Sequence, residues 1–208
     1  TNEIWSFEQS TFSWTKILLF GEHIKKREES VAASFCHENN TIIYVFGGKH
    51  HNRLFSDLIK IDISQQSISI VQTTGNTPPP MTGSFMSYYN NKLYVWGGCV
   101  NLTDNIMNQT LYVYDIQSNR WNSKLIENIP GRCNASSVTI DGKMYIYGGL
   151  KDETSLLIID LNTLQMESIP TFGVAPIPNY NYGRLLKVKD HLFYFGGKAN
   201  NKFTLLYA

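Results

Sequence analysis

A double glycine after a short aromatic and aliphatic run occurs four times in this chain of 208 residues. This repeat constrains the fold more than any other feature. The glycine pairs are Gly47 and Gly48, Gly97 and Gly98, Gly148 and Gly149, and Gly196 and Gly197. Their first members are separated by 50, 51 and 48 residues. A period of this length indicates that one supersecondary unit is repeated along the chain.

A second motif has the same period. An apolar run ends in an acid, and a large apolar residue follows six positions later, as in Asp115 and Trp121. Glu8 and Trp14 show the same spacing with no glycine pair before them, so the N-terminal segment is predicted to be the second half of a repeat. We expect the acid to close the turn between the third and fourth strands. We expect Trp14 and Trp121 to pack between neighbouring units.

Each unit is predicted to hold four short strands, because the apolar runs are brief and show no helical periodicity. The run Leu93–Trp96 is apolar on both faces, which is typical of a strand whose sheet is covered on both sides. Sheets arranged radially satisfy this requirement and leave only short edges exposed. The glycine pair is expected where backbones crowd and a side chain has no room.

These motifs resemble the Kelch repeat, whose signature is four hydrophobic residues, a double glycine and a spaced aromatic pair. The junction Gly75-x-x-Pro78-x-Pro80 recurs at Gly173, and it resembles the GxxPxPR subgroup. The resemblance implies an all-β Kelch-type β-propeller of four-stranded antiparallel blades in a single domain, 1–208. The expected units are a partial blade at 4–20, blades at 21–73, 74–127 and 128–170, and a partial blade at 171–208.

The strand count bears on ring closure. Residues 4–20 supply strands three and four of one blade, and residues 182–208 supply strands one to three of another. Both ends therefore fall in the third strand position and duplicate each other. We expect an arc cut from a longer ring of six or seven blades, with a closed four-bladed ring as the alternative.

The loops between strands two and three and the loops between blades are expected on one face, where a rigid scaffold presents recognition residues. This face carries a basic cluster with acidic residues among it, namely Lys25, Lys26, Arg27, Lys49, His50, His51 and Arg53 with Glu22, Glu28 and Glu29. The cluster is predicted either to recognise an acidic partner segment or to be an ordinary solvated surface.

Three further residues are candidates for the same face. Tyr180 and Tyr182 could anchor a partner, since Tyr is favoured in interfaces, or Tyr182 could be the first residue of an inner strand. Arg132 occupies the Kelch junction position, and Arg27 aligns with it; Met81 and Asn179 replace the arginine in the other two junctions. The resemblance implies that this position contributes to the binding face.

Composition narrows the classes of partner. The net charge is only +1 and charged residues make up 17%, against about 25% in typical chains, which disfavours a nucleic-acid binder. No apolar run approaches the length of about 18 residues that a membrane helix requires. Cys36, Cys99 and Cys133 lack metal-site spacing, so free thiols in the cytoplasm are expected. The His50–His51 pair is expected to be exposed and not a metal site.

No catalytic motif or nucleotide-binding loop occurs in the sequence, so no catalytic residue, cofactor or metal is predicted. The predicted function is a protein–protein interaction scaffold or adaptor that binds a partner through its loops, without enzymatic activity. Expected partners are proteins, including an acidic segment, and further blades or domains of the same protein. The alternatives are an enzyme with its active site in the central pocket and a structural subunit that pairs through an exposed blade edge.

Overall fold

Runs rich in Ile, Val, Tyr and Phe form strands along the chain, because β-branched and aromatic side chains pack well on a pleated surface. The computed structural model describes residues 3–38, 40–150, 155–173, 182–199 and 202–203. Within these ranges every regular element is a β-strand. The all-β prediction is therefore confirmed.

Three sheets each contain four antiparallel strands, with each strand paired to the next one of its sheet. The first consists of β4 (Val31–His37), β5 (Asn40–Phe46), β8 (Leu58–Asp62) and β9 (Ser67–Ile70). The second consists of β11 (Thr82–Tyr89), β12 (Lys92–Asn101), β14 (Thr110–Asp115) and β15 (Arg120–Leu125). The third consists of β16 (Ser136–Ile140), β17 (Lys143–Tyr147), β18 (Leu156–Asp160) and β19 (Met166–Ile169).

Short strands extend the first two sheets. β3 (Phe20–Gly21) pairs in parallel with β9, and β10 (Thr74–Gly75) pairs in parallel with β15. β13 (Ile106–Met107) pairs with β12, and β6 (Lys49–His50) forms a small hairpin with β7 (Arg53–Leu54). These additions fall in the junctions and in the loops after the glycine pairs.

Incomplete units stand at the two ends. β1 (Ile4–Glu8) and β2 (Ser13–Ile17) form one hairpin, and β20 (Arg184–Val188) and β21 (His191–Phe195) form another. β22 (Lys198–Ala199) and β23 (Lys202–Phe203) form a further short pair. The third strand predicted at the C-terminal end falls mostly on 204–208, which lie outside the described residues.

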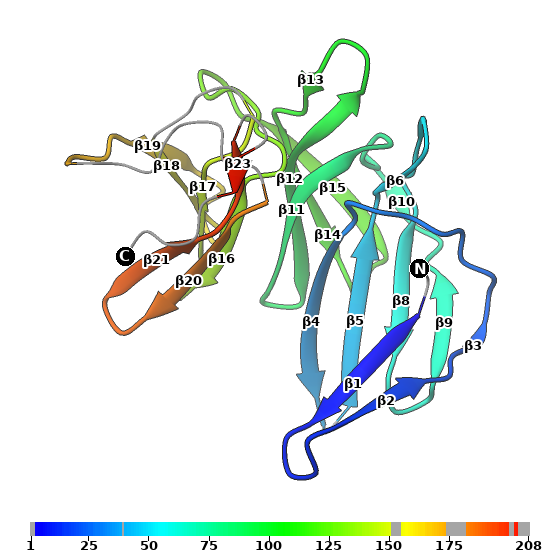
Figure 1. Cartoon of the computed structure of the whole chain (residues 1–208). Coiled ribbons are helices and arrows are strands. Elements are labelled where there is room, and N and C mark those ends of the chain that lie inside the picture. Colours follow the sequence, from blue (N-terminus) through cyan, green and yellow to red (C-terminus); the bar gives the residue numbers. More distant parts are fainter. Residues whose placement is uncertain (1–2, 39, 151–154, 174–181, 200–201, 204–208) are drawn as a thin grey trace.

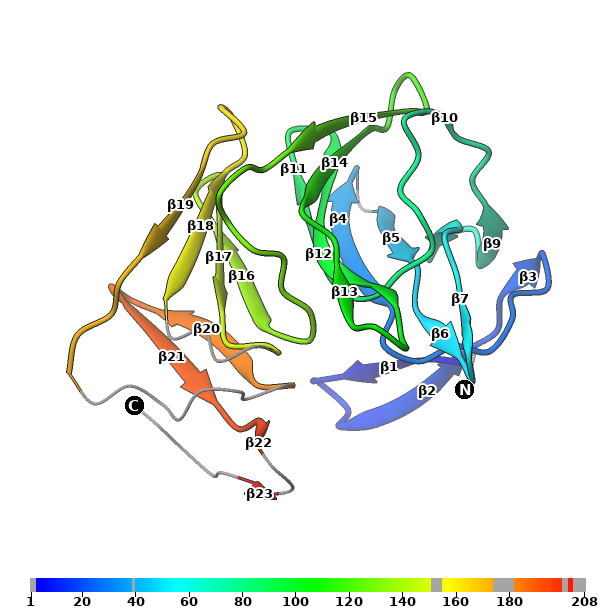
Figure 2. The same ribbon diagram turned by 90° about the horizontal axis from the view of Figure 1, so that it is seen from above.

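The sheets stand side by side around a common axis, as Figures 1 and 2 show. The starts of β4, β11, β16 and β20 line a groove of about 390 Å³ at this axis. Successive sheets pack face to face, with Leu93 and Val95 of β12 on the side of the first sheet and Trp96 on the side of the third. This is the radial β-propeller architecture that the repeat predicts.

Trp121 shows how one such interface is filled. Its side chain on β15 is only 1% exposed, and its ring lies 6.0 Å from that of Phe46 on β5 of the neighbouring sheet. Tyr114, on the adjacent strand, lies 5.0 Å from Trp121 between centroids. The predicted packing of Trp121 between neighbouring units is thus confirmed.

The prediction for Trp14 is wrong. Its side chain on β2 is 66% exposed, and its ring contact is with Phe7 of its own hairpin, 5.0 Å away. Among the described residues no further sheet covers the outer face of this hairpin. A side chain at this position is buried only where a neighbouring sheet covers it, and the sequence motif alone does not ensure this.

The glycine pairs lie where one sheet meets the junction of the next. The N–H of Gly98 donates to the carbonyl of Arg132 at 2.8 Å, and the N–H of Gly48 donates to the carbonyl of Met81 at 2.9 Å. Gly97 has φ of +69°, and a Cβ there would come within 2.4 Å of the Arg132 carbonyl oxygen. Both the backbone conformation and the lack of space therefore require glycine, as the repeat predicts.

The acid of the second motif closes the turn between the third and fourth strands. Asp115 accepts a hydrogen bond from the N–H of Ser118 at 2.9 Å, and Asp160 accepts one from the N–H of Thr163 at 2.9 Å. These backbone donors hold the pKa of both carboxyls below the usual value of 3.8. Their role is structural, as expected.

Candidate partner-binding face

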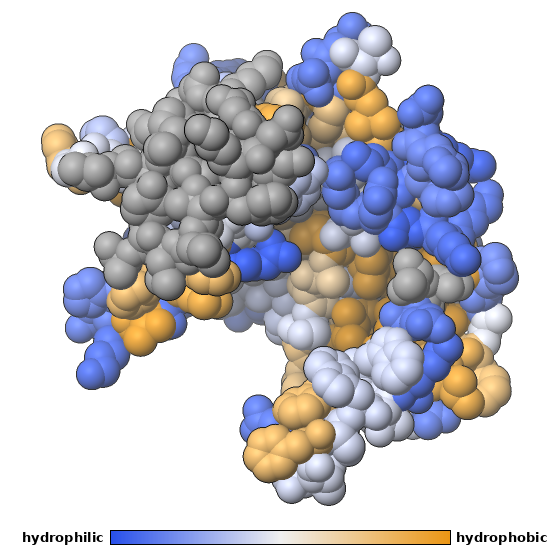
Figure 3. All heavy atoms as spheres, in the orientation of Figure 1, coloured by the Kyte–Doolittle hydropathy of each residue, from blue (hydrophilic) through white to orange (hydrophobic). Residues whose placement is uncertain are grey.

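The loops between the second and third strands and the loops between sheets lie at the same end of the propeller. In Figure 1, the β6–β7 hairpin and β13 stand at the upper end, and the turns of β1–β2 and β20–β21 lie at the lower end. Two backbone hydrogen bonds of 2.9 Å join Glu28 in the first junction to Lys49 in β6. The two basic segments therefore lie next to each other, as predicted. Figure 3 shows this part of the upper face as largely hydrophilic.

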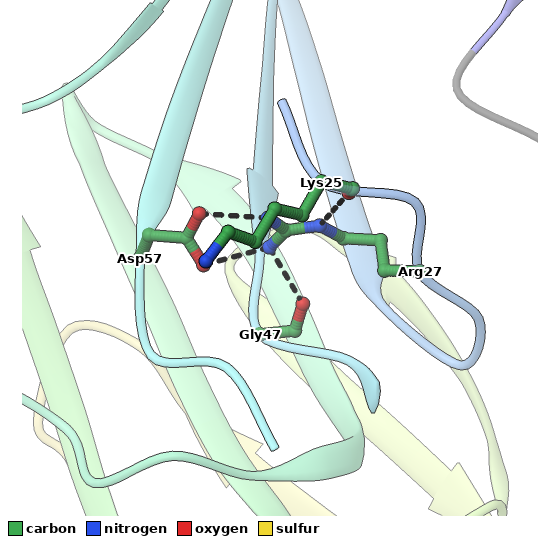
Figure 4. Close-up of polar contacts among 4 residues, drawn as sticks. All are labelled: Lys25, Arg27, Gly47 and Asp57. Carbon is green, nitrogen blue, oxygen red and sulfur yellow. Dashed lines mark hydrogen bonds and ion pairs between the residues drawn. The ribbon is translucent and has the colours of Figure 1, made fainter. Parts of the chain in front are cut away.

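The Arg27 side chain is buried in contacts within the protein, where the sequence led us to expect an exposed group. Figure 4 shows its guanidinium forming a two-fold ion pair with Asp57, with both N–O distances 2.7 Å. The same group donates to the carbonyl of Gly47 at 3.0 Å and lies 4.4 Å from the centroid of the Phe55 ring. The side chain is 7% exposed. Arg27 therefore fixes the loop between β7 and β8 to the junction.

Arg132 has the same role in the third sheet. Its side chain is 1% exposed and donates to the carbonyl of Ser155 at 2.8 Å and to the Ser155 hydroxyl at 2.7 Å. Ser155 directly precedes β18, just as Asp57 directly precedes β8. Arg27 and Arg132 are thus both buried in contacts within their own unit, so neither is an exposed group on this face.

Lys25, Lys26, His50, His51 and Arg53 remain as exposed cationic or titratable side chains on this face. The two imidazoles stand at the tip of the β6–β7 hairpin with their ring centroids 4.2 Å apart. Arg53 lies 5.7 Å from the Phe55 ring centroid, measured from its guanidinium carbon. Across the described ranges, no group of three His, Cys, Asp or Glu side chains is arranged to hold a metal ion.

Four residues at the same position in successive units form a chain of backbone hydrogen bonds around the axis. Gly83 donates to Glu29 at 3.0 Å, Asn134 to Gly83 at 2.9 Å, and Tyr182 to Asn134 at 2.9 Å. All four residues have positive φ, between +53° and +65°. This chain aligns the inner strands and directs the Glu29, Asn134 and Tyr182 side chains to the mouth of the axial groove.

The Tyr182 hydroxyl connects the C-terminal partial unit to the unit of the first full sheet. It donates to a Glu29 carboxylate oxygen at 3.0 Å and accepts from the Asn134 amide at 3.3 Å. Burial of the hydroxyl and the neighbouring Glu29 charge raise the pKa of Tyr182 to about 12. Lys49 forms an ion pair with the same Glu29 carboxylate at 2.8 Å.

Tyr182 precedes β20 by two residues, so it is not the first residue of that strand, and its side chain is 51% exposed. Tyr180 falls outside the described residues. Sequence reasoning missed Asp57, Phe55 and the contact between Glu29 and Tyr182. Aligning Asp57 with Ser155 beside the repeated arginine could have indicated the first of these.

Comparison with known proteins decides the family. The family described as the KLHDC2/KLHL20/DRC7 Kelch-repeats domain matches residues 32–208. The chain belongs to the Kelch-repeat family. Its structure is also similar to the solved structure of YjhT, with a TM-score of 0.70, 19% sequence identity and coverage of 89% of this chain and 63% of that one. This second similarity supports the Kelch-type propeller fold.

Several known proteins are similar in sequence. Acyl-CoA-binding domain-containing protein 4 of Arabidopsis thaliana is 29% identical over 90% of this chain and 30% of its own length. Kelch domain-containing protein 1 of Homo sapiens is 37% identical over 51% of this chain and 29% of its own length. The Rab9 effector protein with kelch motifs of Homo sapiens is 26% identical over 77% of this chain and 45% of its own length. The chain thus spans less than half the length of these relatives.

The name of the Rab9 effector identifies a protein partner for that relative. As for membranes, the described part of the chain has no helix long and apolar enough to cross one.

Proposed function

We propose that this Kelch chain is a protein-interaction module. Its partner docks on the loops at the upper end of the first full sheet, where the first junction and the β6–β7 hairpin meet. The exposed side chains of Lys25, Lys26 and Arg53 are the principal contacts, with His50 and His51 beside them. The partner segment is acidic, because Lys25, Lys26 and Arg53 form no ion pair with a described residue, although Glu22 and Glu28 lie in the same junction. One observation carries the proposal: Arg27 is buried and ion-paired, whereas Lys25, Lys26 and Arg53 are exposed and form no ion pair with a described residue.

The pairing pattern supports this division. Arg27 is neutralised by Asp57, and Lys49 is neutralised by Glu29. Within the described part of the chain, Lys25, Lys26 and Arg53 form no ion pair. Exposed cations of this kind accelerate the approach of an acidic partner and favour it over a basic one.

The rigidity of these loops also supports the proposed docking surface. The Arg27–Asp57 ion pair and the hydrogen bonds between Glu28 and Lys49 hold the junction and the β6–β7 hairpin together. Loops that are ordered before binding lose little conformational entropy on docking. The Rab9 effector among the relatives is consistent with a protein partner.

Peptide selection tests the proposal. Random peptides displayed on phage are selected on the immobilised chain, and we expect the enriched sequences to be rich in Asp and Glu. The double variant Lys26→Glu, Arg53→Glu should lose these peptides, because it reverses two exposed charges. Lys189→Glu, in the β20–β21 turn at the opposite end, is the matched control and should retain them. Enrichment of peptides without acidic residues, or binding indifferent to the double variant, would contradict the proposal.

A further inference from the structure

A groove of about 340 Å³ lies at the edge of the proposed binding face, next to the Arg27–Asp57 ion pair. Its lining includes the side chains of His23, Lys25, Arg53, Phe55 and Asp57 together with Pro80. These residues come from the first junction, from β7 and the loop that follows it, and from the second junction. The groove is therefore built from loop segments far apart in sequence, and the Arg27 contacts fix two of them against each other.

The charge inside this groove is unbalanced. Asp57 is the one carboxylate among the lining residues, and both of its oxygens are engaged by Arg27 at 2.7 Å. Figure 4 shows the Lys25 and Arg27 side chains extending in the same direction, toward Asp57. Lys25 and Arg53 add two positive charges that form no ion pair with a described residue. An anion entering the groove would meet this uncompensated charge.

Phe55 holds the two guanidinium groups in place. Its ring is 8% exposed and lies 4.4 Å from the guanidinium carbon of Arg27 and 5.7 Å from that of Arg53. An arginine over an aromatic ring keeps its N–H groups at the ring's margin, free to donate in the plane of the guanidinium. Because Arg27 uses its donors on Asp57, Gly47 and Lys25, the Arg53 fork is the one left for a ligand.

We propose that this groove is a subsite for a single oxyanion-bearing side chain of the partner, bound by the Arg53 fork and the Lys25 ammonium. The group is a carboxylate or a phosphate, since both oxyanions accept two parallel hydrogen bonds from arginine. The inference rests on the proposed function, because it assigns one acidic residue of the partner to one place on that face. It goes further by separating the role of Lys25 and Arg53 from that of Lys26, which does not line the groove.

Defined peptides test the subsite by fluorescence anisotropy with the full chain. The probes are fluorescein-labelled Gly/Ser octapeptides with two central residues of Glu, of Gln, or with a central phosphoserine. We expect the Glu or the phosphoserine peptide, or both, to bind at least about tenfold more tightly than the Gln peptide, as charged hydrogen bonds contribute this much. The two anionic peptides distinguish the carboxylate from the phosphate. Equal binding of all three probes would overturn the subsite.

Single variants distinguish the subsite from the rest of the face. Arg53→Gln and Lys25→Gln should each remove most of the preference for the anionic probe. Arg53→Lys should restore only part of it, because lysine keeps the charge without the planar fork. Lys189→Gln is the control and should bind as the unmodified chain does. All three positions are exposed, so unchanged thermal melting will verify folding.

The outcomes separate this inference from the proposed function. If Lys26→Gln weakens binding and both Lys25→Gln and Arg53→Gln leave it unchanged, the subsite is wrong and the basic face remains the docking surface. If none of the three changes binding, both proposals fail. Loss of the anionic preference in Lys25→Gln and Arg53→Gln, with the preference retained in Lys26→Gln, supports the subsite.

Discussion

Trp121 and Trp14 occupy the same position of the repeat, yet one is buried and the other is exposed. Trp121 is 1% exposed between the first two full sheets, and Trp14 is 66% exposed on the N-terminal hairpin. The hairpin also exposes Trp5, Phe7 and Phe12, and Figure 3 shows apolar surface at its tip. The difference teaches that the signature specifies a strand with an apolar side chain, while the adjoining sheet determines whether that side chain is buried.

Truncating the two tryptophans gives the largest expected contrast. Trp121→Ala should lower the free energy of unfolding by about 3–5 kcal/mol, because it removes a buried aromatic ring and leaves a cavity. Trp14→Ala should lower it by no more than about 0.5 kcal/mol, because the ring is exposed. Urea unfolding of both variants measures the contrast. Similar losses would show that Trp14 is covered in solution and would break the comparison.

The glycine pairs sharpen the same contrast. Gly97 and Gly196 have the same φ of +69°, but a Cβ at Gly196 meets no atom of the described residues within 4 Å. Gly196→Ala should therefore cost only the backbone strain, about 1–2 kcal/mol. Gly97→Ala adds a clash with the backbone of the next junction, and we expect a loss above about 3 kcal/mol. Melting temperatures measure both variants. An equal shift would refute the crowding of backbones at Gly97.

The smallest expected effect is on the pKa of the acids that close the turns. Here the second sheet and the N-terminal hairpin should behave alike. Backbone donors lower the pKa of Asp115 in the second sheet and of Glu8 in the hairpin, so the cause is local. Each carboxylate stabilises the fold above its ordinary pKa, and this contribution is lost as the pH falls through the lowered value. NMR titration of the carboxyl carbons should therefore give Asp115 below 3.8 and Glu8 below 4.5. An ordinary value for Glu8 alone would mean that the turn depends on the neighbouring sheet.

The sequence predicted what depends on local chemistry and on the period. The glycine pairs, the turn acids, the four-stranded sheets and the proximity of the two basic segments all follow from residues close in the chain or one repeat apart. Each of these features is present in the structure. They recur because the three full sheets carry the same motifs at the same strand positions.

Contacts between distant residues could not be predicted in this way. Arg27 was expected on the surface, but it pairs with Asp57, 30 positions away. Tyr182 donates a hydrogen bond to Glu29, 153 positions away, and nothing in the repeat pattern predicts this contact. The residues of the candidate site therefore differ from those predicted. Arg27 and Arg132 hold loops in place within their own units. Lys25 and Phe55 line a groove that forms only when the chain is folded.

The most direct test of the proposed binding face is chemical-shift mapping of the labelled chain with the octapeptide that carries two central Glu residues. The shifts should be confined to the first junction, to the β6–β7 hairpin and to the loop that ends at Asp57. The β1–β2 hairpin, and Asn134 and Tyr182 at the axis, should remain unchanged. Shifts centred on the axial groove, with none around Lys25 and Arg53, would contradict the account.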